Sequence, residues 1–308
     1  MALAVPSDDD YSECVQTSER VAWSIDDVLP ASRELNFAIP FLPEALVHLS
    51  TAPIPDAHKL TLNHIRAHSY VNLFAFVEEY IIATALRHAH AEQFGSVPAM
   101  RALLRFADEE LKHQQLFWRF RDAFARGFGH PCDVLDNAVE VAGYILTKPA
   151  LSVMLTTLHL ELITQQHYID AIKSPPEATD LSFRSMFEHH WIEESQHARI
   201  DALEIAKLAA LSSPEATADA VTEYEDILVN LDGLLLKQAD MDRATLERAT
   251  GHEMSADQRA ALVRQQHNSY RQDFIHSGLS NVAFGRLMQR LIGDEGPRRL
   301  ALIAGKFR

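Results

Sequence analysis

The sequence has few of the residues that mark disulfide-rich, strand-rich or nucleic-acid-binding proteins. Only two cysteines, Cys14 and Cys132, occur in 308 residues, and they form neither a CxxC pair nor a disulfide framework. The chain has only 11 glycines, which favours helices over a strand-and-turn architecture. Lys and Arg number 28 against 43 Asp and Glu, so the formal net charge is −15. This charge argues against nucleic acid and against anionic membranes as partners.

Targeting and membrane-spanning signals are also missing from the sequence. The N-terminal stretch MALAVPSDDDYSEC is acidic and has no basic region followed by a long apolar one, so a signal peptide is not expected. No apolar run approaches the roughly 20 residues that a membrane-spanning helix needs. We therefore expect a cytoplasmic protein with no membrane partner.

Prolines and glycines divide the chain into helical segments. Six of the 13 prolines precede residue 56, which predicts an irregular N-terminal segment with short helical pieces at most. No alternation typical of strands persists anywhere, so the fold class is all-α. We expect residues 1–55 to pack on a main unit formed by residues 56–211, and residues 212–308 to complete the same domain. Helices are predicted at about 56–94, 99–126, 132–146, 149–173, 180–211, 215–240, 255–276, 280–292 and 298–306.

Two of these helices carry Glu and His side chains within apolar stripes. One contains Glu110-x-x-His113, and the other contains His190-x-x-x-Glu194-x-x-His197. Spacings of three and four place such side chains on one helix face. The same face is otherwise aromatic or aliphatic in both helices. Since a buried, unpaired carboxylate costs several kcal/mol, a charged group should lie opposite. The apolar residues of the two stripes are Leu103, Phe106, Phe117, Phe120 and Phe124, and then Phe183 and Phe187.

Each motif also follows a helix that offers a glutamate at a similar distance. Glu79 precedes Glu110 by 31 residues, and Glu161 precedes Glu194 by 33. Two Glu-x-x-His helices and two further glutamates are the ligand pattern of di-iron sites in four-helix bundles. The four glutamates contribute a charge of −4, which two divalent cations neutralise. Mixed carboxylate and imidazole ligands favour iron, with manganese as the alternative, over a metal that prefers thiolates.

The first-helix glutamate is ambiguous because Glu78 and Glu79 are adjacent. The track through Val71, Phe74 and Glu78 is more apolar than the track through Asn72 and Glu79, which favours Glu78 as the inward residue. Periodicity alone leaves both choices open.

The residues between about 60 and 210 resemble the p-aminobenzoate N-oxygenase family of di-iron enzymes, within the ferritin-like superfamily. The resemblance implies a ferritin-like four-helix bundle with a di-metal centre and additional N- and C-terminal helices. It selects Glu79 over Glu78 and makes His190 the family's extra ligand. It also places Glu109 and Glu193, where we would expect Asp, beside the ligand histidines. The elements that match are Asn72-x6-Glu79, Glu110-x-x-His113, Glu161 and His190-x-x-x-Glu194-x-x-His197, and the implied iron ligands are Glu79, Glu110, His113, Glu161, His190, Glu194 and His197.

The function that this resemblance implies is O2 activation at two iron ions (Fe2+/Fe3+), with oxygen transfer to the nitrogen of an aryl amine. Electrons are expected from an external reductase or ferredoxin, because the chain shows no flavin, nicotinamide or iron–sulfur motif. A di-iron oxidase, hydroxylase or desaturase acting on carbon, a ferroxidase, and a purely structural scaffold are the alternatives. The C-terminal helices either cover the bundle or form a homodimer surface.

Overall fold

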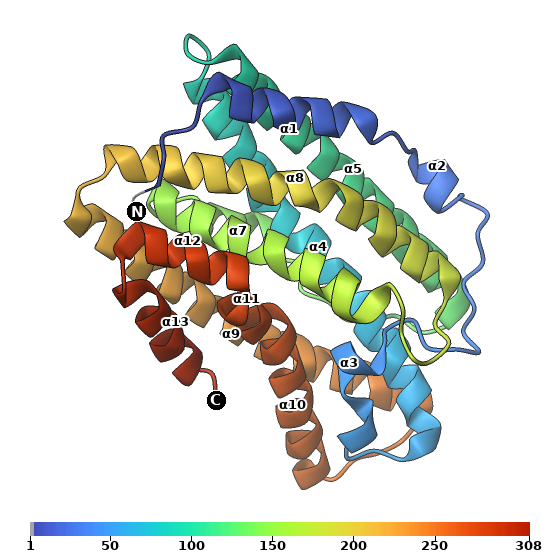
Figure 1. The fold of residues 1–308 in the computed structure, drawn as a ribbon. Helices are drawn as coiled ribbons and strands as arrows, with labels where there is room; N and C mark the ends of the chain where they lie inside the picture. The colour runs from blue at the N-terminus through green and yellow to red at the C-terminus, as the bar shows by residue number, and fades with distance from the viewer. Residues whose placement is uncertain (1–2) are drawn as a thin grey trace.

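The computed structural model describes residues 3–308, and within that range it contains helices and no strand, which confirms the all-α prediction (Figure 1). Four long helices form the centre of the molecule. They are α4 (Asp56–Ala91), α5 (Val97–Phe128), α7 (Ala150–His167) and α8 (Leu181–Leu211). Their bounds agree closely with the predicted segments.

The four central helices pack in pairs and are covered on two sides. Helix α4 lies against α5, α7 lies against α8, and α5 also contacts α8. The N-terminal helix α1 (Asp8–Arg20) crosses the side formed by α5 and α8. Helix α9 (Pro214–Thr250) contacts both α4 and α7 and so covers the opposite side. Figure 1 shows α1 in blue at one side of the central helices and the orange and red C-terminal helices at the other.

Shorter elements connect and flank these helices. The N-terminal region contains α2, α3 and the short helix η1, while α6 links α5 to α7. The C-terminal region folds back on α7 and α9. Their bounds are α2 Ile25–Val28, α3 Glu44–Val47, η1 Leu49–Thr51, α6 Ala138–Ile145, η2 Tyr168–Ile172, α10 Ala256–Arg271, η3 Gln272–His276, α11 Ser277–Ser280, α12 Val282–Ile292 and α13 Glu295–Gly305.

The N-terminal segment is more helical than the proline pattern predicted. Helix α1 has 13 residues and begins with a capping box, in which the Ser7 side chain and the Asp10 side chain each accept a backbone N–H. A second capping box, formed by Ser24 and Asp27, begins α2.

Helix α9 is longer than predicted. It runs about ten residues beyond its predicted end, to Thr250, and is followed by Gly251 in the left-handed conformation (φ 67°).

Two histidines of α7 fix the C-terminal region to the central helices. Helix α10 is interrupted by the π-turn η3, and π-turns leave backbone carbonyls without their usual helical partners. The Nε2 atom of His159 lies 3.0 Å from the carbonyl oxygen of Phe274, and the Nε2 atom of His167 lies 3.1 Å from that of Asp273. Burial lowers the pKa of both histidines to about 4, so each ring is neutral and donates from Nε2. These contacts dock the chain after residue 271 on α7.

Within the described residues, no helix combines the length and the apolar character that crossing a membrane requires.

The close approach of α11 to His159 generates a stability prediction. A Cβ atom at Gly278 would lie 2.4 Å from the His159 ring, whereas a Cβ at Gly285 would meet nothing within 4 Å. Gly278→Ala is therefore expected to destabilise the protein by about 1–3 kcal/mol through overpacking. Gly285→Ala, inside α12, is the matched control and should be neutral or stabilising. Urea denaturation of both variants provides the measurement, and equal midpoints would contradict the close packing.

Candidate metal centre

Three of the four central helices bring six of the glutamate and histidine side chains into one buried cluster. Its members lie on α4, α5 and α8, and each is at most 2% exposed. Two groups have ligand atoms that all lie within 4.8 Å of one another, and they share His113. The first group is Glu110, His113, Glu194 and His197, and the second is Glu78, His113 and His190.

Glu194 lies at the middle of this cluster. Its Oε1 atom is 2.9 Å from Nε2 of His190, 3.2 Å from Nδ1 of His113 and 3.6 Å from Nδ1 of His197. Nδ1 of His197 also lies 2.7 Å from Oε1 of Glu110. The predicted convergence of the α5 and α8 motifs is therefore present in the structure.

Two further carboxylates hold the histidines from outside the cluster, in a crossed arrangement. Oε2 of Glu193, on α8, lies 2.9 Å from Nε2 of His113 on α5. Oε2 of Glu109, on α5, lies 2.9 Å from Nε2 of His197 on α8. A carboxylate at Nε2 fixes a proton there and directs Nδ1 into the cluster, where it can bind a metal once it carries no proton of its own. The longer Glu side chains thus make these contacts at the two positions where the family resemblance led us to expect Asp.

Residues from the N-terminal region complete the surroundings of these outer carboxylates. The Ser18 hydroxyl, on α1, donates to Glu109. Lys112 Nζ lies 2.5 Å from Oε1 of Glu193 and also sits 3.9 Å from the centre of the Trp23 ring. The Trp23 ring stacks on His113 at an interplanar angle of 7°. Nothing in the local sequence around Ser18 or Trp23 predicts these contacts.

The structure places Glu78, and not Glu79, in the cluster. Glu78 is 2% exposed, and its Oε1 lies 3.6 Å from Nε2 of His190. Glu79 is half-buried, and its Oε2 accepts a hydrogen bond of 2.9 Å from Nε2 of Gln114. Because consecutive helical residues point about 100° apart, only one of the two can face inward. The more apolar track through Phe74 therefore predicts the inward residue correctly, and the Glu79 position implied by the resemblance does not match this geometry.

Glu161, on α7, lies beside the cluster without joining either group. It is 3% exposed, and its Oε2 has no hydrogen-bond partner in the described part of the chain. One turn later, Nε2 of Gln165 donates to the backbone oxygen of Glu194 at 3.2 Å, which places this turn of α7 against the central turn of α8. The α7 segment that carries Glu161 therefore packs against the α8 turn that carries Glu194.

His190 lies in an aromatic environment. Its ring contacts Phe74, Phe117 and Phe187 at centroid distances of 5.0–6.0 Å. Burial, together with the neighbouring His113, holds the pKa of His190 well below its usual value. The ring is therefore neutral, as a metal ligand must be.

The protonation states show how strongly the cluster groups act on one another. Burial raises the pKa of Glu78 well above its usual value, and the nearby Glu110 and Glu194 raise it further. Burial opposes the charge on Glu110, yet His197 and His113 lower the pKa of this carboxyl. Burial also disfavours the charge on His113, but Glu110 and Glu193 raise the pKa of its ring to about 9. Without a cation, protons on these groups take the place of the missing positive charge.

The donor set fits metal ions. Many of the buried polar atoms that lack a hydrogen-bond partner within residues 3–308 belong to this one cluster. Buried polar groups are nearly always hydrogen-bonded, so such a concentration of exceptions is what a cation-binding site without its cation would show. The cluster atoms without a partner are both carboxylate oxygens of Glu78, Oε1 of Glu110, Nδ1 of His113, Nδ1 of His190, Oε1 of Glu194 and Nδ1 of His197, and Oε2 of Glu161 on α7 also has none.

Asp201 is a further buried carboxylate that sequence reasoning missed. It lies one turn after His197 on α8, is fully buried, and both of its oxygens lack a partner in the described chain. Burial raises the pKa of Asp201 well above its usual value. Its four-residue spacing from His197 is the signal that could have identified it.

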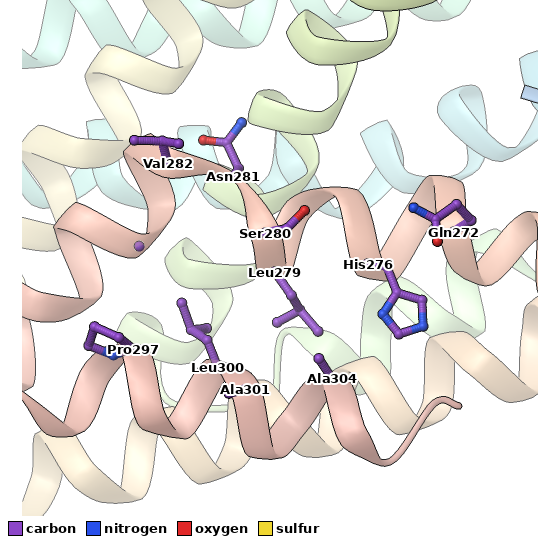
Figure 2. Close-up of a pocket in the computed structure, with 11 residues that line it drawn as sticks. Gln272, His276, Leu279, Ser280, Asn281, Val282, Pro297, Leu300, Ala301 and Ala304 are labelled. Carbon is purple, nitrogen blue, oxygen red and sulfur yellow. The ribbon is translucent and has the colours of Figure 1, made fainter. Parts of the chain in front are cut away.

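A surface cleft of larger volume lies away from this cluster. A cleft of about 540 Å³ is bordered by α11, α12 and α13 (Figure 2). Its labelled residues, among them His276 and Asn281, come from the C-terminal region, and none of its lining residues belongs to the cluster.

Comparison with known proteins adds no family to this description, because neither a known protein family nor a curated protein matches the sequence. The interpretation of the site therefore depends on its residues and their geometry.

Glu78 and Glu79 provide a matched pair for testing the ligand assignment. Glu78→Gln removes a buried carboxylate from the cluster, and we expect it to weaken metal binding by more than the roughly 10–100-fold that loss of an outer partner costs. Glu79→Gln leaves the cluster intact and should bind metal like the wild type. Fe(II) titration under anaerobic conditions measures both affinities. If Glu79→Gln bound Fe(II) more weakly than Glu78→Gln, Glu79 would be the ligand instead.

The raised pKa of His113 predicts that metal uptake releases protons. At pH 7 the metal-free ring carries a proton, since its pKa is about 9, and a metal can bind Nδ1 only after a proton leaves. Apparent affinity should therefore rise as pH increases from 6 toward 9. A pH-indicator dye in weak buffer measures the released protons during anaerobic Fe(II) titration. Uptake without proton release, or affinity independent of pH, would contradict this protonation state.

Proposed function

We propose that this protein is a di-iron oxygenase that activates O2 at the buried cluster, with N-oxygenation of an aryl amine as its reaction. The observation that carries the proposal is the convergence of Glu78, Glu110-x-x-His113 and His190-x-x-x-Glu194-x-x-His197 in one buried cluster, with the buried Glu161 on the adjacent helix α7. The arrangement of α4, α5, α7 and α8 is consistent with a ferritin-like bundle, in which such motifs hold two metal ions.

Ligand chemistry supports iron, with manganese as the alternative. Glu78, Glu110, Glu161 and Glu194 provide four carboxylates, and His113, His190 and His197 provide three imidazoles. The four negative charges match two divalent ions, and the neutral imidazoles add no charge. When bound, two iron ions supply the redox chemistry that activates O2.

The protein's own groups orient the ligands and exclude water. Glu109 and Glu193 fix the rings of His197 and His113 through their Nε2 atoms. The phenylalanines around His190 keep that side of the cluster apolar, so competing proton donors are kept away from an oxidising centre. An external reductase or ferredoxin is needed to supply electrons, as the sequence indicates.

Metal content and turnover test this proposal. Protein produced with iron is expected to contain about two irons per chain, in keeping with the two-metal pattern of such sites. His190→Ala and Glu194→Ala should lower that content, while Glu188→Gln, at an exposed position of the same helix, should not. Aerobic incubation with an aryl amine and a reducing system should then give oxygenated nitrogen products in the wild type and in Glu188→Gln, but not in His190→Ala or Glu194→Ala.

The outcomes separate the candidate functions. Iron binding with N-oxygenated product supports the proposal. Iron oxidation and accumulation without product would indicate a ferroxidase, and oxygenation or desaturation at carbon would indicate the other oxygenase class. No bound transition metal in the wild type would overturn the metal centre itself.

A further inference from the structure

An apolar pocket lies beneath α6, on the side of the central helices that α9 covers. Its volume is about 40 Å³, and its walls come from α4, α6, α7 and α9. The floor consists of the buried side chains of Phe76, Tyr80, Thr156 and Leu160. Helix α9 contributes the partly buried Leu231.

Two polar groups at this pocket are used in hydrogen bonds to the protein, whereas the buried Tyr80 hydroxyl has no hydrogen-bond partner within the described residues. The Thr156 hydroxyl donates to the backbone oxygen of Ser152 at 3.0 Å. At the outer edge, Nδ2 of Asn230 donates to the Tyr144 hydroxyl at 2.9 Å. Buried cavities with apolar walls stay dry and take up apolar molecules such as xenon.

The floor of the pocket adjoins the cluster. Leu160 immediately precedes Glu161 on α7, and Phe76 lies two residues before Glu78 on α4. The Tyr80 ring lines the pocket, while its buried phenol is close enough to Asp201 and Glu110 for their charges to raise its pKa, after burial itself. Tyr80 therefore separates the pocket from the region of the metal ligands.

We propose that this pocket is the binding chamber through which O2 reaches the cluster, with Tyr80 as its inner wall and the Tyr144–Asn230 hydrogen bond at its outer edge. The inference rests on the proposed function, because only an O2-using centre needs such a chamber. Size selects the occupant: about 40 Å³ accommodates a small gas molecule but not an aromatic substrate. The predominantly apolar walls favour an apolar gas over water.

Xenon provides a probe of the pocket that does not depend on activity. In crystals of the full chain pressurised with xenon, we expect anomalous density in the pocket of the wild type. Leu231→Trp fills the pocket from α9, the wall farthest in sequence from the ligands, and should abolish that density. Leu236→Trp is the matched control, because Leu236 lies on the same helix, is 45% exposed and does not line the pocket.

Stopped-flow mixing of iron(II)-loaded protein with O2 tests the role of the pocket as a route. Leu231→Trp should slow the second-order oxidation of the iron on the order of tenfold, as expected when access is obstructed. Leu236→Trp should react at the wild-type rate, and both variants should bind Fe(II) like the wild type. Val141→Phe, which narrows the pocket from α6, is the second blocking variant if Leu231→Trp proves unstable in thermal denaturation.

The two proposals fail in different ways. If the wild type binds iron but xenon does not enter the pocket, or if the blocked variant reacts with O2 at the wild-type rate, the chamber is wrong and the metal centre stands. If the wild type binds no iron, the proposed function is wrong. The role of the pocket as an O2 chamber is then wrong as well, whatever the xenon density shows.

Discussion

The burial of negative charge at the centre of the molecule is the constraint on which the rest of the structure depends. Glu78, Glu110 and Glu194 are each at most 2% exposed, and they belong to two adjoining groups that share His113. Burying one unpaired carboxylate costs several kcal/mol, and placing three together adds their mutual repulsion. Apolar packing alone cannot hold such groups together. The fold is stable with this arrangement only when cations, or protons in their absence, occupy the space between the carboxylates.

The crossed pairing of the outer carboxylates shows how the two halves of the centre depend on each other. His113 on α5 is held by Glu193 of α8, and His197 on α8 is held by Glu109 of α5. Each helix therefore supplies both a histidine of the cluster and the carboxylate that orients its neighbour's histidine. A shift of α5 along α8 would break both hydrogen bonds at once, so the register of the two helices and the geometry of the ligands are fixed by the same contacts.

Periodicity in the sequence was sufficient to predict the long helices and the motifs on α5 and α8, because a spacing of three and four residues places side chains on one face of a single helix. It was insufficient where the answer depends on contacts between distant segments. The choice between Glu78 and Glu79 depends on the rotation of α4 against its neighbours, and only the apolar track through Phe74 indicated it. The contact of Ser18 with Glu109 joins residues 91 positions apart, and no local pattern encodes it. The length of α1 was missed for a similar reason, since its capping box was hidden in an acidic, proline-flanked segment.

The two covered sides of the central helices differ in chemistry, and this difference suits the oxygen-activating centre that we propose. On the α1 side, Ser18 and Lys112 bind the outer carboxylates, so charge and hydrogen bonds there fix the histidine rings. On the α9 side, the pocket is walled by apolar side chains, and the polar atoms of Thr156 and Asn230 are engaged with the protein. Ligand orientation needs strong directional bonds, whereas entry of an apolar gas needs their absence. Under the proposed function, the fold meets these two requirements on opposite sides of the central helices.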